Sequence, residues 1–70
     1  MYSIKIKNET VEGAIMEVNG NLFLTVNSED ISPDNILRDA GYDVNYLEIG
    51  ERDDNVAEWS GYKFAYEILF

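Results

Sequence analysis

The dipeptide Asn19-Gly20 limits the fold more than any other stretch of the chain, because Asn-Gly is the strongest short signal for a β-hairpin. Both residues tolerate the positive φ of a type I′ turn. Runs rich in apolar residues flank the dipeptide, Val11–Val18 on one side and Leu22–Val26 on the other. We therefore expect two antiparallel strands that meet at this turn.

The register of this hairpin stays open at the level of sequence. A two-residue turn places Val18 opposite Asn21, whereas a three-residue turn places Val18 opposite Leu22. A slip of one residue moves every side chain to the other face of the sheet. Both faces of these strands carry apolar residues, so either register buries a hydrophobic surface.

Three further segments have the patterning of strands. Residues 2–7 alternate between apolar and polar side chains, which predicts a half-buried strand followed by a turn at residues 8–10. Residues 43–49 predict a fourth strand, whose alternation slips between Tyr46 and Leu47, which indicates either a bulge or a strand buried on both sides. Trp59–Phe70 predicts a fifth strand and has the most regular alternation in the chain.

One short helix is expected over Ile31–Gly41. Ser32 has the residue type of an N-cap, and Pro33 suits the first helical position, where its missing N–H costs nothing. Ile31 can pack against Ile36 as a hydrophobic staple, and Gly41 supplies a left-handed exit. Only a few apolar residues of this segment can be buried. The helix is therefore expected to depend on packing against the rest of the domain and not on its own helix propensity.

The predicted order is therefore β-β-β-α-β-β in a single α+β domain that spans residues 1–70. Short links between strands favour an antiparallel sheet. One helix of about two turns cannot cover five strands, so we expect the sheet to be strongly curled or to leave an apolar face open for binding. The chain has no Cys and no His, so packed aliphatic and aromatic side chains must supply its stability.

The charge of the chain restricts its partners. Fourteen Asp and Glu residues against five Lys and Arg residues give a net charge of −9. Direct binding to nucleic acid or to an anionic membrane is disfavoured, since both need a basic surface, and a basic protein partner is favoured. The alternative explanation is that the high negative charge only keeps the protein soluble and has no role in binding a partner. Residues 1–7 lack the pattern of a secretory leader, and no apolar run is long enough to span a bilayer. We therefore expect the protein to be cytoplasmic and to act in the cytoplasm of a host cell during infection.

Catalysis and metal binding are not expected. Without His and Cys, the chain lacks the residue pairs of nucleophilic catalysis, and its five glycines are scattered and form no phosphate-binding loop. Asp53, Asp54 and Asn55 are adjacent in a predicted loop, and their spacing relative to Glu51 and Glu58 does not match a calcium-binding loop. We therefore expect no enzyme activity, no metal and no cofactor.

Two acidic clusters are the candidate partner-binding residues. The first surrounds the last predicted hairpin and consists of Glu48, Glu51, Asp53, Asp54 and Glu58. The second surrounds the predicted helix and consists of Glu29, Asp30, Asp34 and Asp39. Exposed aromatic side chains beside the clusters are expected to anchor a partner, because Trp and Tyr dominate interface hot spots. Trp59, Tyr42 and Tyr46 are the candidates.

A domain of this length has a diameter of roughly 28 Å. A DNA duplex of that length carries about 16 charges, of which a partner meets about half. The net charge of −9 is therefore comparable to one face of a short duplex.

In size, acidity and α+β pattern the whole chain resembles phage-encoded inhibitors of bacterial defence, the anti-CRISPR and anti-restriction proteins. The resemblance lies in general character and includes no motif. It implies a non-enzymatic inhibitor whose acidic, DNA-mimic-like surface blocks the nucleic-acid site of a nuclease or a CRISPR surveillance complex. The alternative is a structural module of a virion or mobile element, which self-associates through a sheet face or edge, for instance as a homodimer.

Overall fold

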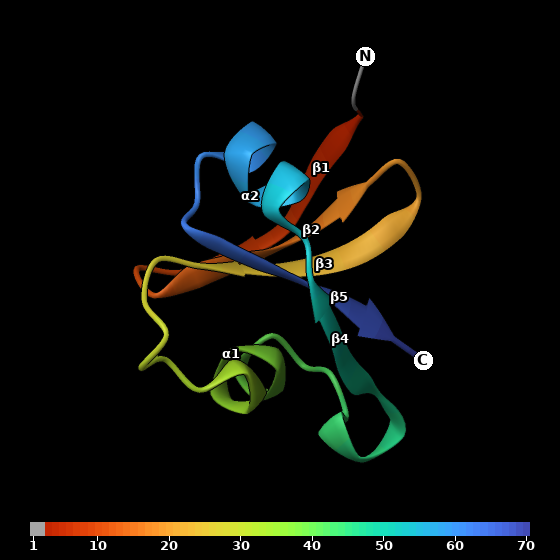
Figure 1. Cartoon of the computed structure of the whole chain (residues 1–70). Coiled ribbons are helices and arrows are strands. Elements are labelled where there is room, and N and C mark those ends of the chain that lie inside the picture. The colour runs from red at the N-terminus through yellow and green to blue at the C-terminus, as the bar shows by residue number, and fades with distance from the viewer. Residues whose placement is uncertain (1–2) are drawn as a thin grey trace.

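The computed structural model describes residues 3–70, so the part of the first predicted strand at Tyr2 lies outside the described residues. The described chain folds as an α+β domain with five strands, two α-helices and one 3₁₀ helix (Figure 1). In chain order these are β1 (Ile4–Glu9), β2 (Gly13–Val18), β3 (Asn21–Val26), α1 (Pro33–Asp39), η1 (Val44–Tyr46), β4 (Glu48–Arg52), α2 (Asp54–Ser60) and β5 (Phe64–Leu69).

The five strands form one antiparallel sheet in the spatial order β1-β2-β3-β5-β4. The last strand in sequence therefore lies between β3 and β4, and the sheet is open, with β1 and β4 at its edges. The expectation of a strongly curled sheet with one helix is wrong. The physical reason is a second helix, α2, which covers the face that curling was expected to bury (Figure 1).

The hairpin between β2 and β3 has the two-residue turn. Val18 pairs with Asn21, and Asn19 and Gly20 both have positive φ, at 51° and 91°. These angles place both residues in the left-handed region that a type I′ turn requires. Of the two registers that the sequence left open, this one puts Ile15 opposite Leu24 on one face and Met16 opposite Phe23 on the other.

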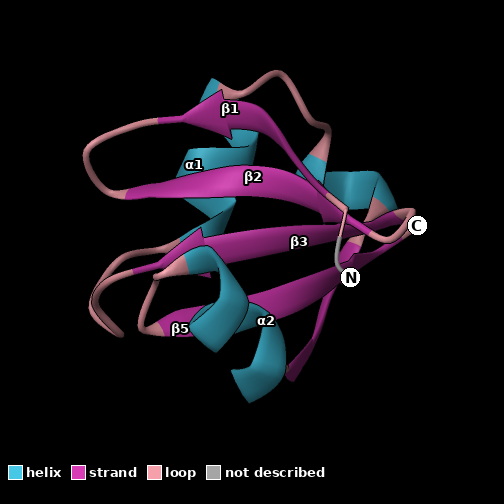
Figure 2. Cartoon of the chain, turned by 90° about the horizontal axis from the view of Figure 1, so that it is seen from above, coloured by secondary structure: helices cyan, strands magenta, loops and turns pink. Residues whose placement is uncertain are grey.

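Helices cover opposite faces of the sheet, and each face has its own hydrophobic cluster (Figures 1 and 2). On the face covered by α2, the buried cluster consists of Ala14, Met16, Val18, Phe23, Val56, Ala57 and Ala65. On the face covered by α1, it consists of Ile15, Leu24, Val26, Ile36, Leu37 and Ile68. Because β2 and β3 are buried on both faces of the sheet, they carry apolar residues at consecutive positions, as is usual for strands that are covered on both sides. The buried hydroxyl of Thr25 donates to the Ala14 carbonyl oxygen at 3.2 Å.

The predicted helix is confirmed as α1, with Pro33 in its first turn and Ile36 and Leu37 buried. Its end is a Schellman motif: the Gly41 N–H donates to the Arg38 carbonyl and the Tyr42 N–H donates to the Leu37 carbonyl. Gly41 has φ of 93°, which is the left-handed exit expected there. Ser32 holds the N-cap position, although its side chain makes no capping hydrogen bond to the described backbone.

The second half of the chain differs from the prediction. The strand expected at residues 43–49 begins only at Glu48, because Asp43 caps η1 by accepting a hydrogen bond from the Asn45 N–H at 3.0 Å. The slip in alternation at Tyr46 marks the end of this 3₁₀ helix and not a bulge. The strand expected at 59–70 begins at Phe64, because Trp59 and Ser60 belong to α2.

The first turn also lies later than predicted. β1 continues to Glu9, and the chain turns at Thr10–Gly13, where the Thr10 N–H donates to the Gly13 carbonyl at 2.8 Å. Val11 is fully exposed in this turn, so β2 begins at Gly13 and not at Val11. No described helix has the length and the apolar composition needed to cross a membrane.

Candidate functional site

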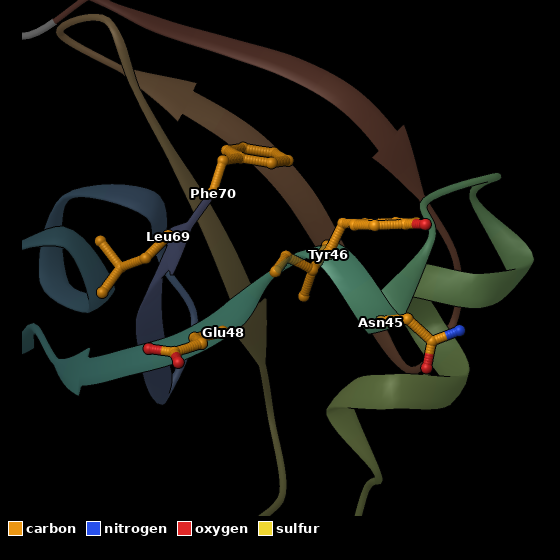
Figure 3. A pocket seen from close by; sticks show the side chains of 6 residues that line it. Asn45, Tyr46, Glu48, Leu69 and Phe70 are labelled. Carbon is orange, nitrogen blue, oxygen red and sulfur yellow. The ribbon is translucent and has the colours of Figure 1, made fainter.

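An open hollow lies beside edge strand β4, where η1 ends and the end of β5 pairs with β4 (Figure 3). Glu48 is paired with Leu69 across these strands, so η1 and residues 69–70 are brought together by the sheet itself. The hollow has a volume of roughly 460 Å³ and is lined by Asn45, Tyr46, Leu47, Glu48, Leu69 and Phe70.

Three apolar side chains of this hollow are uncovered. Tyr46 is 78% exposed, Phe70 is 81% exposed and Leu69 is 43% exposed. In Figure 3 the rings of Tyr46 and Phe70 are both seen edge-on and lie roughly parallel, while the Glu48 side chain extends toward the side of Leu69. Large apolar groups that gather on a surface, with polar groups around them, mark interaction sites.

A second open hollow adjoins the first along the same pair of strands. It has a volume of roughly 470 Å³ and is lined by Gly50, Glu51, Arg52, Asp53, Glu67 and Leu69. Leu69 lines both hollows, so they form one continuous surface. We call this the β4–β5 surface and define it by Tyr46, Glu48, Glu51, Asp53, Glu67, Leu69 and Phe70. Its centre is apolar, and its border carries four carboxylates together with the guanidinium of Arg52.

A bulge shapes this surface at Gly50. The register of β4 against β5 shifts between Ile49 and Arg52, so β4 contains one more residue than its partner there. A Cβ atom on Gly50 would lie 3.0 Å from the Glu67 carbonyl oxygen and 3.3 Å from a methyl group of Leu69. Glycine at position 50 therefore allows β4 to approach β5 closely at the bulge, where Glu51 and Glu67 line the same hollow.

The structure separates the members of the first acidic cluster. Glu48 borders the first hollow, and Glu51 and Asp53 border the second. Asp54 lies in the first turn of α2 and forms an exposed ion pair with Arg52, at 3.2 Å between Nε and Oδ1. Glu58 and Trp59 lie further along α2, where both are at least partly exposed.

The second acidic cluster lies on the other side of the sheet. Glu29 and Asp30 are in the loop before α1, Asp34 is in the first turn of α1, and Asp39 is its last residue. Because α1 and α2 pack on opposite faces, the two clusters do not form one acidic face (Figure 1). The described acidic residues bring together no group of three that could hold a metal ion.

The three candidate aromatic anchors have different surroundings. Tyr46 is exposed in the first hollow, whereas Tyr42 packs against the cluster beneath α1. Trp59 is partly exposed on α2. Three residues of the β4–β5 surface, Glu67, Leu69 and Phe70, were not among the sequence candidates. Glu67 and Leu69 alternate with the buried face of β5, which was the available signal for them.

Tyr62, in the segment between α2 and β5, forms a hydrogen bond to Glu9 of edge strand β1. The Tyr62 hydroxyl donates to a Glu9 carboxylate oxygen at 3.4 Å. Burial raises the pKa of Tyr62, and the negative charge of Glu9 raises it further. Because β1 and β4 are at opposite edges, this pair connects the segment after α2 to β1 and takes no part in the β4–β5 surface.

Asp53 also has a structural role, as the N-cap of α2, which is distinct from any role in binding. Its carboxylate accepts hydrogen bonds from the Asn55 and Val56 N–H groups, at 3.0 and 3.1 Å, and so caps α2. We expect Asp53→Ala to lower the free energy of unfolding by about 1 kcal/mol in urea titrations followed by circular dichroism. Asp53→Asn keeps a capping oxygen and removes the charge, so it should retain most of the stability. Equal losses in both variants would contradict the capping role.

No protein-family model matches this chain, and no curated protein or solved structure matches it significantly.

Proposed function

We propose that the protein is a non-enzymatic inhibitor that binds another protein through the β4–β5 surface. The partner is a basic protein of a host defence system, a nuclease or CRISPR surveillance complex, whose nucleic-acid site the inhibitor blocks in the cytoplasm of the infected cell. The observation that carries this proposal is the exposed apolar group of Tyr46, Leu69 and Phe70, bordered by carboxylates at an open sheet edge.

The two parts of this surface have separate roles in binding. Burying the aromatic and aliphatic centre supplies affinity, since about 25 cal/mol is gained per Å² of apolar surface removed from water. The surrounding carboxylates and the net charge of −9 steer the approach of a basic partner and exclude nucleic acid and other acidic proteins. In the described part of the chain, ion pairs join only Lys7 to Glu17 and Arg52 to Asp54, which leaves most carboxylates available to a partner.

Both edge strands oppose the alternative, in which the chain self-associates strand to strand. The register of β1 shifts between Ile6 and Asn8, and that of β4 shifts between Ile49 and Arg52. Bulges and charged side chains on edge strands hinder pairing with another chain. Lys5 and Lys7 on β1 and the carboxylates of β4 add such charges. Helices on both faces of the sheet also leave less apolar surface for face-to-face assembly.

A pair of charge-reversal variants tests the proposal. We expect the double substitution of Glu48→Lys and Glu51→Lys to weaken binding to the partner at least about tenfold, because each new lysine faces basic groups of the partner. The matched control is Glu29→Lys with Asp30→Lys, which changes the net charge equally but lies on the loop before α1. All four carboxylates are exposed, so both variants should fold.

The experiment begins with capture from a bacterial lysate by the immobilised full chain, at low and at high salt, with identification of the captured proteins by mass. A basic nucleic-acid-binding protein should be captured at low salt and released at high salt, because the contacts at the border are charge pairs. Duplex DNA should compete with the inhibitor for the purified protein. Binding that ignores salt and DNA, or that both double variants weaken equally, contradicts the proposal.

A further inference from the structure

We infer that Asn19, in the turn between β2 and β3, is a site of spontaneous deamidation, and that a hydrogen bond from Ser3 limits its rate. A glycine follows Asn19, whereas each other asparagine of the chain precedes a residue with a side chain. This turn joins β2 to β3 and lies outside the β4–β5 surface. The inference therefore goes beyond the proposed function and does not depend on it.

The reaction is a ring closure within the chain, followed by hydrolysis. The backbone nitrogen of Gly20 loses its proton and attacks Cγ of Asn19; a bond forms between these two atoms, the bond from Cγ to Nδ2 breaks, and ammonia leaves. Water then opens the five-membered imide ring at either of its carbonyl groups. One opening gives aspartate at position 19, and the other gives isoaspartate, in which the main chain runs through the side-chain carbons. Water is consumed and ammonia is released, without an oxidant or a reductant.

The turn leaves this reaction open to solvent. Asn19 and Gly20 are both exposed, so water and hydroxide reach the reacting atoms. Gly20 has no side chain to shield its own nitrogen. A Cβ atom on Gly20 would meet no described atom within 4 Å, so no packed group covers this side of the turn either.

Two hydrogen bonds between Asn19 and Ser3 oppose the ring closure. The Ser3 N–H donates to Oδ1 of Asn19 at 3.0 Å, and the Asn19 N–H donates to the Ser3 carbonyl oxygen at 3.0 Å. The side-chain amide is therefore held toward the residue before β1, together with the N–H of Asn19 itself, whereas the attacking nitrogen follows Asn19 in the chain. Turning Cγ toward that nitrogen breaks the hydrogen bond to Oδ1, so the reaction proceeds from molecules in which this bond is open.

A rate measurement tests this inference. The folded full chain, its variants Ser3→Pro and Ser3→Ala, and an acetylated and amidated peptide of residues 15–24 are incubated at mildly alkaline pH, and deamidation at each asparagine is followed by peptide mass spectrometry. Proline removes the N–H that holds Oδ1, and alanine keeps it. We expect Ser3→Pro to react at position 19 about two- to tenfold faster than the unsubstituted chain, the change in population that the loss of one hydrogen bond gives. Ser3→Ala should react at the unsubstituted rate, and the peptide faster than any folded chain.

Asn27 is the control within each molecule, because it is exposed, lies outside the turn and is followed by Ser28. Its rate should be equal in Ser3→Pro and in the unsubstituted chain. Equal rates at position 19 in the two Ser3 variants would overturn the inference, as would an equal acceleration at Asn27, which would mean that proline loosens the whole domain. The comparison with the peptide needs no variant: a folded chain that reacts at position 19 as fast as the peptide would overturn the restraint by Ser3.

The two products should differ in their effect on the hairpin. An aspartate at position 19 keeps an oxygen for the Ser3 N–H, and Asp-Gly forms the same type of turn. Isoaspartate adds a backbone carbon to the two-residue turn that pairs Val18 with Asn21. We expect Asn19→Asp to unfold at nearly the same urea concentration as the unsubstituted chain, and the isoaspartate form, separated chromatographically from aged protein, to unfold at a lower one. Equal midpoints for the two forms would contradict this consequence.

Discussion

Gly13→Ala is expected to remove a large part of the stability of the domain, with a loss of about 3 kcal/mol in the free energy of unfolding. A Cβ atom at this position would overlap the Thr25 carbonyl oxygen of β3 and lie 2.9 Å from a Val26 methyl carbon and 3.3 Å from one of Ile36. The obstacle is backbone of the central strand pair, which cannot rotate away as a side chain can. A chain of this length has a total stability of roughly 4–10 kcal/mol.

Gly20→Ala is the matched control for this prediction. Gly20 has φ of 91°, but a Cβ atom there would meet no described atom within 4 Å. Gly20→Ala should therefore lower the free energy of unfolding only through the strain of a positive φ at alanine, by about 1–2 kcal/mol. Urea unfolding of both variants, followed by circular dichroism, gives the comparison. If Gly13→Ala is no more destabilising than Gly20→Ala, then β2 and β3 do not approach each other as closely as described.

Leu24→Ala is expected to cost about 3–5 kcal/mol, the upper part of the range for a leucine in a well-packed core. Leu24 is fully buried on β3, opposite Ile15 on one neighbouring strand and Tyr66 on the other, and it belongs to the cluster beneath α1. Such a site cannot collapse easily, because strands flank it on both sides. The loss is large relative to the total stability, so the variant should be partly unfolded at body temperature.

Leu69→Ala makes the same chemical change at a partly exposed position of β5 and serves as the control. We expect it to cost less than about 1.5 kcal/mol, because water already reaches much of the side chain. Urea midpoints of the two variants, compared with that of the unsubstituted chain, measure the difference. Similar costs for both would mean that the cluster beneath α1 is not closely packed around Leu24.

The parts of the fold that sequence could predict are those with local signals. Asn19-Gly20 allows one family of turns, and its position between apolar runs predicted the β2–β3 hairpin. Pro33 and Gly41 framed α1 in the same way, because each residue suits one end of a helix. The choice between the two hairpin registers had no local signal, since apolar side chains occupy both faces of β2 and β3.

The second helix was missed because its signals are few. α2 has seven residues and buries only Val56 and Ala57, which is too little to show a helical period. Asp53 and Gly61 do frame it as N-cap and left-handed exit, but they lie in a run of charges that is equally typical of a loop. The place of β5 between β3 and β4 depends on contacts between distant segments, for which the sequence has no local pattern.

The candidate site was predictable in part. Glu48 and Glu51 were expected at a partner-binding surface, and Tyr46 was a candidate anchor. Glu67 and Leu69 join them only because β5 pairs with β4 in a register that contains a bulge. Predicting that surface would have required the strand order and the position of the extra residue in β4. The separation of the two acidic clusters likewise depends on α2, which the sequence pattern did not indicate.

The insertion of β5 between β3 and β4 also has a consequence for how the chain folds. One side of β3 stays without a partner until β5 arrives, and α1, η1, β4 and α2 all lie between these two strands in sequence. Pairings between distant segments form late, because the intervening loop must first be closed. During that interval β3 exposes Asn21–Val26, six residues with no charge, proline or glycine, a composition that favours intermolecular β-stacking. The net charge of −9 is expected to oppose such association, since like-charged molecules repel one another while β3 is still uncovered.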